Sequence, residues 1–228
     1  MGDDLLRQVR REVRREAAPF ALAILAANVL LALVSRGSGW ELFGSTDWWV
    51  WLLLAAPSAL LVVTLAVGAS RIGLERLQRE IAIALLALLG VGTGAATLCL
   101  VVSLTRWAPS GPQLLVSAVV VLVTNVITYA LVFWEIDDGG PIARALAERR
   151  AHPDFQFPQD ENRELARPSW APALVDYLYL SLTNSVAFSP TDAMPLTHHA
   201  KLFMGIESTI SLLTVLVVGA RAINVLGS

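Results

Sequence analysis

A single acidic residue, Glu207, interrupts an apolar run close to the C-terminal end of this 228-residue sequence. An acidic side chain in such surroundings is costly and usually faces water or a polar partner. Glu207 is therefore a candidate for cation binding or proton transfer. The alternative is a hydrogen bond or ion pair with Lys201 or a neighbouring helix. Asp192 precedes the run, where it would attract cations or cap a turn over residues 189–192.

Other polar residues indicate structure more than chemistry. His198 and His199 are adjacent, and neighbours on a helix point about 100° apart, so the pair suits a pH-sensitive cap better than a metal site. Asn125, with Thr124 and Thr128, lies inside an uncharged run and predicts hydrogen bonds between helices. We expect no bound metal and no cofactor.

Catalytic signatures are absent. The sequence has no phosphate-binding glycine loop, no His-Glu-x-x-His site and no serine elbow, so we expect no enzyme. The net charge of −2 leaves no basic footprint for nucleic acid. Glu135, Asp137 and Asp138 form an acidic group that would pair with the arginines of residues 144–150 or concentrate cations.

The distribution of charge indicates a membrane protein. Apolar residues make up 55% of the chain and charged residues 16%, against roughly 25% charged in soluble domains. About 20 apolar residues cross a bilayer, and an isolated segment can do so only as a helix. We therefore predict an all-α membrane protein with five transmembrane helices. Their apolar runs are 17–35, 48–70, 81–105, 107–134 and 202–220.

Arginine sets the predicted orientation. Three segments, one N-terminal, one between the second and third runs and one after the fourth, hold thirteen arginines, whereas the intervening segments hold only Arg36 and Arg106. The positive-inside rule then places the N-terminus and residues 135–171 in the cytoplasm. Residues 1–16 fit a basic amphipathic helix on the membrane surface or, alternatively, a charged cap on the first span.

Residues 172–184 predict a helix that is too short to cross. Pro172 suits a first helical turn, and Pro190 prevents continuation. Thirteen residues rise only ~20 Å, so the helix would re-enter the membrane or lie on its surface. A short apolar helix, a polar loop and then a full span is the layout of a pore loop.

This stretch resembles the pore helix, selectivity filter and inner helix of tetrameric potassium channels. Residues 177–183 are similar to the aromatic-rich pore helix, and residues 186–189, Val-Ala-Phe-Ser, stand where the family has Val-Gly-Tyr-Gly. Asp192 and Pro195 fall near its post-filter Asp and Pro. The resemblance implies a pore-like module over 107–228, preceded by a three-helix membrane region over 17–106. Within the module it implies an outer helix 107–134, a cytoplasmic-side connector 135–171, a re-entrant pore helix 172–184, a filter-like loop 185–197 and an inner helix 200–226.

The filter departs from the family pattern. Ala187 and Ser189 replace glycines whose backbone freedom the carbonyl ladder needs, so a standard ladder is not expected. Three outcomes remain: a wider pore, a path for another solute, or a fold that does not conduct. The arginine count would also turn the loop to the cytoplasm, as in the inverted pore of ionotropic glutamate receptors, whereas the potassium-channel resemblance implies that it faces outside. The candidate pore and filter-like residues are Thr183, Asn184, Ser185, Val186, Ala187, Phe188, Ser189 and Asp192, with Glu207 as the intramembrane acid.

The resemblance thus implies a homotetrameric cation channel that passes monovalent ions passively. The chain also resembles a group of bacterial membrane proteins without an assigned activity, which implies the bacterial inner (plasma) membrane, and the arginine distribution predicts a cytoplasmic N-terminus there. The expected partners are the lipid bilayer and further copies of the chain, with no nucleic acid. One alternative is a non-conducting scaffold or sensor that keeps the pore fold. Another is a small proton-coupled transporter that uses Glu207.

Overall fold

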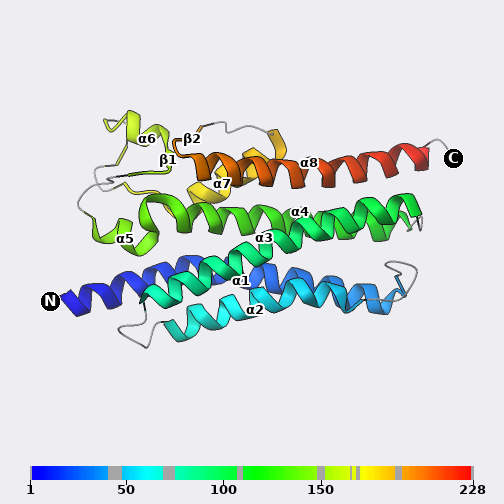
Figure 1. The fold of residues 1–228 in the computed structure, drawn as a ribbon, viewed down its shortest axis with the longest axis horizontal. Helices are drawn as coiled ribbons and strands as arrows, with labels where there is room; N and C mark the ends of the chain where they lie inside the picture. The colour runs from blue at the N-terminus through cyan, green and yellow to red at the C-terminus, as the bar shows by residue number, and fades with distance from the viewer. Residues whose placement is uncertain are drawn as a thin grey trace.

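The protein is a bundle of long helices with short elements gathered toward one end (Figure 1). The computed structural model describes residues 2–40, 48–68, 75–106, 110–147, 152–164, 166–167, 170–187 and 192–226. The long helices are α1 (Gly2–Gly37), α2 (Val50–Gly68), α3 (Glu75–Arg106), α4 (Gly111–Ile136) and α8 (His198–Leu226). The short elements are a 3-10 turn η1 (Asp137–Gly139), α5 (Pro141–Leu146), β1 (Phe155–Gln156), α6 (Pro158–Glu161), α7 (Leu174–Ala187) and β2 (Met194–Pro195).

Within the described residues, four helices are long and apolar enough to cross a membrane: Asp4–Gly37, Leu77–Leu104, Gly111–Gly139 and His198–Ala220. The apolar part of α2, Val50–Ala66, is shorter. The expectation of a helical chain with several long apolar helices is therefore confirmed, while a fifth crossing stays a prediction.

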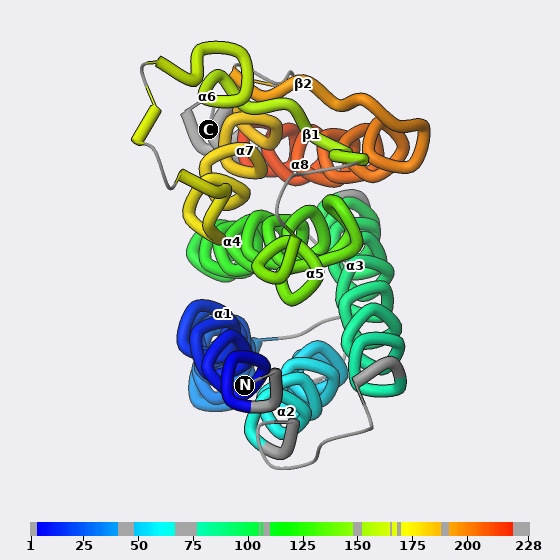
Figure 2. The backbone as a smooth tube through the Cα atoms, turned by 90° about the vertical axis from the view of Figure 1, so that its left-hand side faces the viewer, coloured from blue at the N-terminus to red at the C-terminus, as the bar shows by residue number. Residues whose placement is uncertain are grey.

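Helix α4 occupies the centre of the bundle. It contacts α1, α3, α7 and α8, and the end-on view shows α1 and α2 below it, α7 and α8 above it and α3 beside it (Figure 2). Two apolar cores fill the space between these helices. One surrounds Phe133, Phe155 and Tyr177 near the end that holds the short elements. The other joins Leu31, Trp51 and other side chains toward the opposite end.

Helix boundaries differ modestly from the predicted ones. Helix α1 runs without a break through residue 16 and through Pro19, so the basic segment continues directly into the first apolar run. Val9 and Ala17 are buried along this stretch, and their packing offsets the backbone hydrogen bond that Pro19 lacks. The short helix predicted over residues 172–184 forms as α7, in which the Asp176 side chain accepts from the Ala173 backbone N–H at 2.8 Å and so caps the first turn.

The connector carries more structure than an extended chain. Strand β1 pairs antiparallel with β2, matching Phe155 with Pro195 and Gln156 with Met194. The pairing brings the connector beside the segment that leads into α8, which begins at His198. Within the predicted loop 185–197, the first three residues belong to α7 and residues 194–195 form β2, while residues 188–191 lie outside the described part.

Candidate functional site

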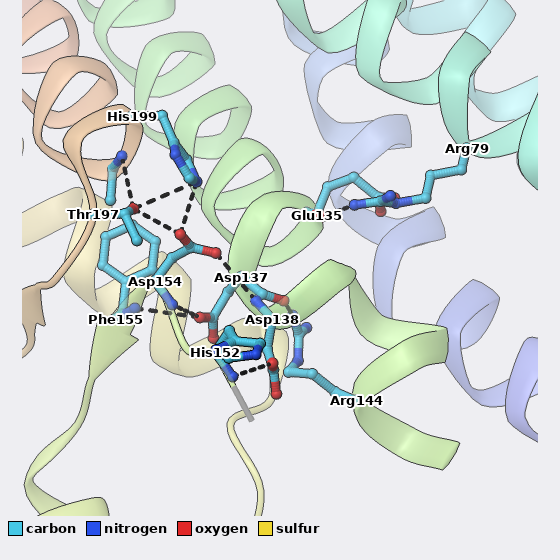
Figure 3. Close-up of polar contacts among 11 residues, drawn as sticks. Arg79, Glu135, Asp137, Asp138, Arg144, His152, Asp154, Phe155, Thr197 and His199 are labelled. Atoms are coloured by element: carbon cyan, nitrogen blue, oxygen red, sulfur yellow. Dashed lines mark hydrogen bonds and ion pairs between the residues drawn. The ribbon is translucent and has the colours of Figure 1, made fainter. Parts of the chain in front are cut away.

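Helix α7 begins at the end of the molecule where α4 ends and α8 begins. The Tyr177 hydroxyl hydrogen-bonds to the side chain of Asp137, just after α4. His199, in the first turn of α8, lies 2.7 Å from Asp154, whose own backbone N–H bonds to Asp137. The starts of α7 and α8 are therefore tied to one acidic centre, and Figure 3 shows the part of it that links His199, Asp154 and Asp137.

The other end of α7 lies well along α8. The Asn184 amide donates to the Met204 carbonyl oxygen at 3.0 Å, and the Ser208 hydroxyl donates to the Asn184 carbonyl oxygen at 3.2 Å. Glu207 stands nine residues beyond His198, the first residue of α8, a rise of ~14 Å. Helix α7 thus runs alongside α8 for only part of its length, and the chain returns to the same end before α8 starts.

Glu207 lies at this inner end of α7 and is fully buried. Three side chains from one face of α7 surround its carboxyl group. Ser181 and Ser185 lie within hydrogen-bond distance of Oε1, the latter at 3.0 Å, and the Asn184 amide lies 2.6 Å from Oε2. These positions are spaced i, i+3 and i+4, the spacing that brings side chains to one face of a helix.

The hydrogen bonds continue from Glu207 toward α4 and α3. The Ser211 hydroxyl lies 3.0 Å from that of Ser185, and the Asn125 amide donates to Ser211 Oγ at 3.0 Å. Thr93 on α3 lies 3.3 Å from Asn125 Oδ1. We call Glu207, Ser181, Asn184, Ser185, Ser211 and Asn125 the Glu207 cluster. The expected interhelical role of Asn125 is confirmed.

Counting hydrogens indicates the protonation state of Glu207. The Ser181 hydroxyl has one hydrogen, but two acceptors lie within reach: the Val126 carbonyl oxygen at 2.7 Å and Glu207 Oε1. If Glu207 carries a proton on Oε1, that proton is donated to Ser181 Oγ, and the hydrogen of Ser181 is donated to Val126. None of the ion pairs among the described residues involves Glu207. A neutral acid thus satisfies the groups around it without burying a charge.

A second polar centre surrounds Asp137, which is fully buried (Figure 3). Its Oδ1 accepts from the backbone N–H groups of Asp154 at 2.7 Å and Phe155 at 3.2 Å, while Oδ2 accepts from Tyr177. Arg144 donates to the Asp137 carbonyl oxygen at 2.5 Å, and its guanidinium lies 5.2 Å from the centre of the Tyr177 ring. This centre fixes the connector and the start of α7 against the end of α4.

The acidic group that follows the fourth apolar run uses partners that the sequence did not identify. Glu135 pairs with Arg79 on α3, with Arg79 Nε 3.2 Å from Oε1. Asp138 accepts from the His152 backbone N–H at 3.0 Å. Of the expected arginines, Arg144 approaches carbonyl oxygens, and residues 149 and 150 lie outside the described part.

The structure brings together only some of the predicted pore residues. Asn184, Ser185 and Glu207 meet inside the subunit. Thr183 is half-buried and its hydroxyl bonds back to carbonyl oxygens of α7 itself. Val186, Ala187 and Asp192 are exposed, and Phe188 and Ser189 lie outside the described residues. Sequence reasoning missed Ser181 and Ser211, although their four-residue spacing from Ser185 and Glu207, respectively, was a usable signal.

Metal ligands do not gather in the described residues: no group of three or more His, Cys, Asp or Glu side chains there is placed to hold a metal ion. His199 instead pairs with Asp154, and His198 is exposed. Comparison with models of protein families, with curated proteins and with solved structures finds no match. Function is therefore inferred from these residues and their geometry.

Proposed function

We propose that this chain is an integral membrane protein of the bacterial inner membrane that forms a homotetramer and passes monovalent cations through a potassium-channel-like pore. The observation that carries the proposal is the course of α7. It starts beside Asp137, ends beside Glu207, and returns its chain to the end where it began. Such a segment, set between an outer helix α4 and an inner helix α8, has the layout of a pore loop.

The C-terminal end of α7 favours cations. A helix carries partial negative charge at its C-terminal end, where carbonyl groups lack intrahelical partners. In the proposed membrane setting, this end of α7 lies inside the bilayer, a level at which irregular backbone requires shelter by protein or water. Several copies of the chain around an axis would shelter this backbone with protein and enclose water between them. They would also direct the C-terminal ends of several α7 helices toward one central ion path.

The outer face of α7 also favours assembly. Val175, Tyr179, Leu182 and Val186 recur at intervals of four, three and four residues, and each is exposed in the single subunit. Leu202 and Ile206 on α8 are exposed as well. These side chains form an apolar surface that neighbouring subunits or lipid would cover.

The direct test is ion flux in liposomes that contain the purified protein. We expect potassium or sodium flux, and we expect Val186→Trp to block it by filling the space next to the inner end of α7. Leu60→Trp places the same ring on the exposed side of α2 and serves as the matched control with normal flux. A tetrameric protein without flux of any monovalent cation would reject the proposal.

Proton-coupled transport is a second candidate, because the groups that hydrogen-bond to Glu207 are all satisfied when its carboxyl group carries one proton. A chain of hydroxyl groups, Ser211 and Ser185 on one side and Ser181 on the other, adjoins that carboxyl group. This mechanism predicts that Glu207→Gln abolishes uptake driven by a pH gradient while the protein stays folded. Flux that is independent of the proton gradient, and that survives Glu207→Gln, favours the channel instead.

A further inference from the structure

A cavity of about 600 Å³ opens at the arginine-rich end of the bundle, away from the Glu207 cluster. It is lined by residues of α1, α2 and α3, by Glu135 at the end of α4, and by the turn that leads into α5. Figure 2 looks onto this end, where α1 and α2 stand on one side and α5 on the other. Four separate parts of the chain therefore enclose one space.

The charged lining of this cavity favours an anion. Arg10 and Arg14 come from adjacent turns of α1 and Arg79 comes from α3, whereas Glu135 is the acidic residue in the lining. Three positive groups against one negative group leave a formal charge of +2. Guanidinium groups bind phosphate oxygens through paired hydrogen bonds, so a phosphate ester suits this lining.

Local backbone geometry holds one of these arginines in place. Gly140 has φ +95°, and a Cβ atom at this position would lie 3.3 Å from Arg79 Nε and 3.1 Å from the Glu135 carbonyl oxygen. Arg79 also donates to that carbonyl oxygen at 3.3 Å. The absence of a side chain at Gly140 thus lets the Arg79–Glu135 pair form part of the cavity wall.

The rest of the lining is apolar. Val13, Leu65, Ala82 and Ile142 are half-buried side chains that face the cavity from four different elements. Arg14 and Arg79 lie only a few residues before the uncharged runs that begin at positions 17 and 81. The charged part of the cavity therefore lies next to an apolar part. This combination suits an amphiphile better than a small soluble anion. Basic pockets between membrane helices are known to bind anionic headgroups.

We propose that the cavity binds one anionic phospholipid, with its phosphate at Arg10, Arg14 and Arg79 and the start of its acyl chains beside the apolar lining. The inference rests on the membrane location within the proposed function and is independent of ion passage. Binding can therefore be measured without any flux assay, and the two proposals can fail separately.

The test is native mass spectrometry of the full-length protein in neutral detergent, titrated with phosphatidylglycerol or phosphatidylcholine. We expect one tightly bound phosphatidylglycerol and no comparable binding of phosphatidylcholine. The double variant Arg10→Gln, Arg14→Gln should bind phosphatidylglycerol at least ~10-fold more weakly, since it removes two charge-assisted contacts. The matched control is Arg11→Gln, Arg15→Gln, which removes the same charge from the same helix outside this cavity and should retain the affinity.

Equal loss in the two double variants would overturn the proposal, because it would indicate general attraction to the charged end of α1. Equal affinity for glycerol phosphate would also overturn it and would assign the cavity to a soluble anion. Arg10 is buried, so the double variant could fold poorly. If the double variant folds poorly, Ile142→Trp serves as the test, because it fills part of the cavity and keeps all three arginines. It should weaken phosphatidylglycerol binding at an unchanged melting temperature, and unchanged binding would reject the site.

Discussion

Glu207 forms hydrogen bonds with both serines and the asparagine on one face of α7. An ionised carboxylate at this position would need a nearby cation, and none of the ion pairs described supplies one. A neutral carboxylic acid can both accept from Ser185 and donate to Ser181. The carboxyl group therefore connects α8 to α4 through Ser181 while it holds α7 between them.

Replacing Glu207 tests this account. Glu207→Gln keeps a donor toward Ser181 but cannot accept from Ser185 with the same atom, so we expect a loss of about 1 kcal/mol in unfolding free energy. Glu207→Ala removes both functions and opens a cavity, and should cost roughly 2–5 kcal/mol. Thermal unfolding in detergent measures both, with Glu161→Gln on exposed α6 as the control. A glutamine variant that unfolds as readily as the alanine variant would contradict a neutral acid.

Tyr177 offers a separate test of the Asp137 centre. Its hydroxyl bonds to buried Asp137, so Tyr177→Phe leaves one carboxylate oxygen without that donor. We expect a loss of about 1–3 kcal/mol in unfolding free energy. Tyr179, two residues further along α7, is 52% exposed, and Tyr179→Phe should change stability by less than about 0.5 kcal/mol. Equal effects of the two substitutions in a melting experiment would show that the hydroxyl bond to Asp137 contributes little.

At the level of helices and strands, hydropathy and proline positions predicted much of the chain. The apolar runs identified α1 to α4 and α8, and Pro172 and Pro190 bracketed α7 to within three residues. The acidic centre of the connector was not predictable in this way. Asp137 binds backbone N–H groups of residues 154 and 155, and such contacts depend on how the chain folds back and not on residue type.

The polar face of α7 was only partly predicted. The sequence treated Thr183, Asn184 and Ser185 as one lining stretch, because a loop was expected from residue 185. In the structure the helix continues to Ala187, so helical spacing separates them. Ser185 and Asn184 turn toward Glu207, and Thr183 bonds to its own helix. If the helix had ended at residue 184, as predicted, Ser185 would not have joined Asn184 on one helical face toward Glu207.

The depth of α7 can be tested with two single cysteines in a Cys99→Ser background. Val175 and Val186 are each 63% exposed in the subunit but lie near opposite ends of the helix. If α7 enters the membrane, Val175→Cys should react quickly with a membrane-impermeant thiol reagent added from the N-terminal side. Val186→Cys should react at least ~10-fold more slowly, because the reagent must pass along a narrow wet path. Similar rates at both positions would indicate a helix lying flat on the surface.

The molecule as a whole exposes apolar side chains on both outer sides of the bundle. Helix α4 contacts α1, α3, α7 and α8. On one outer side, α7 and α8 carry exposed apolar residues that include Leu202, Ile206 and Leu212, and on the other side α2 carries Leu53 and Leu60. In the proposed assembly α7 and α8 face the axis and the neighbouring subunits, while α1 and α2 face lipid.

Assembly of this kind predicts which helix cross-links between copies. In the Cys99→Ser background, Leu212→Cys on α8 should give covalent dimers under oxidation, because helices that surround a common axis approach one another closely. A longer bifunctional thiol reagent should also leave the product at the dimer, since each subunit offers one thiol. Leu53→Cys on α2 is more exposed than Leu212, at 62% against 42%, yet it should stay monomeric if α2 faces lipid. Dimers from α2 and none from α8 would place the subunit interface on the other side of the bundle, and would remove α7 from any shared axis.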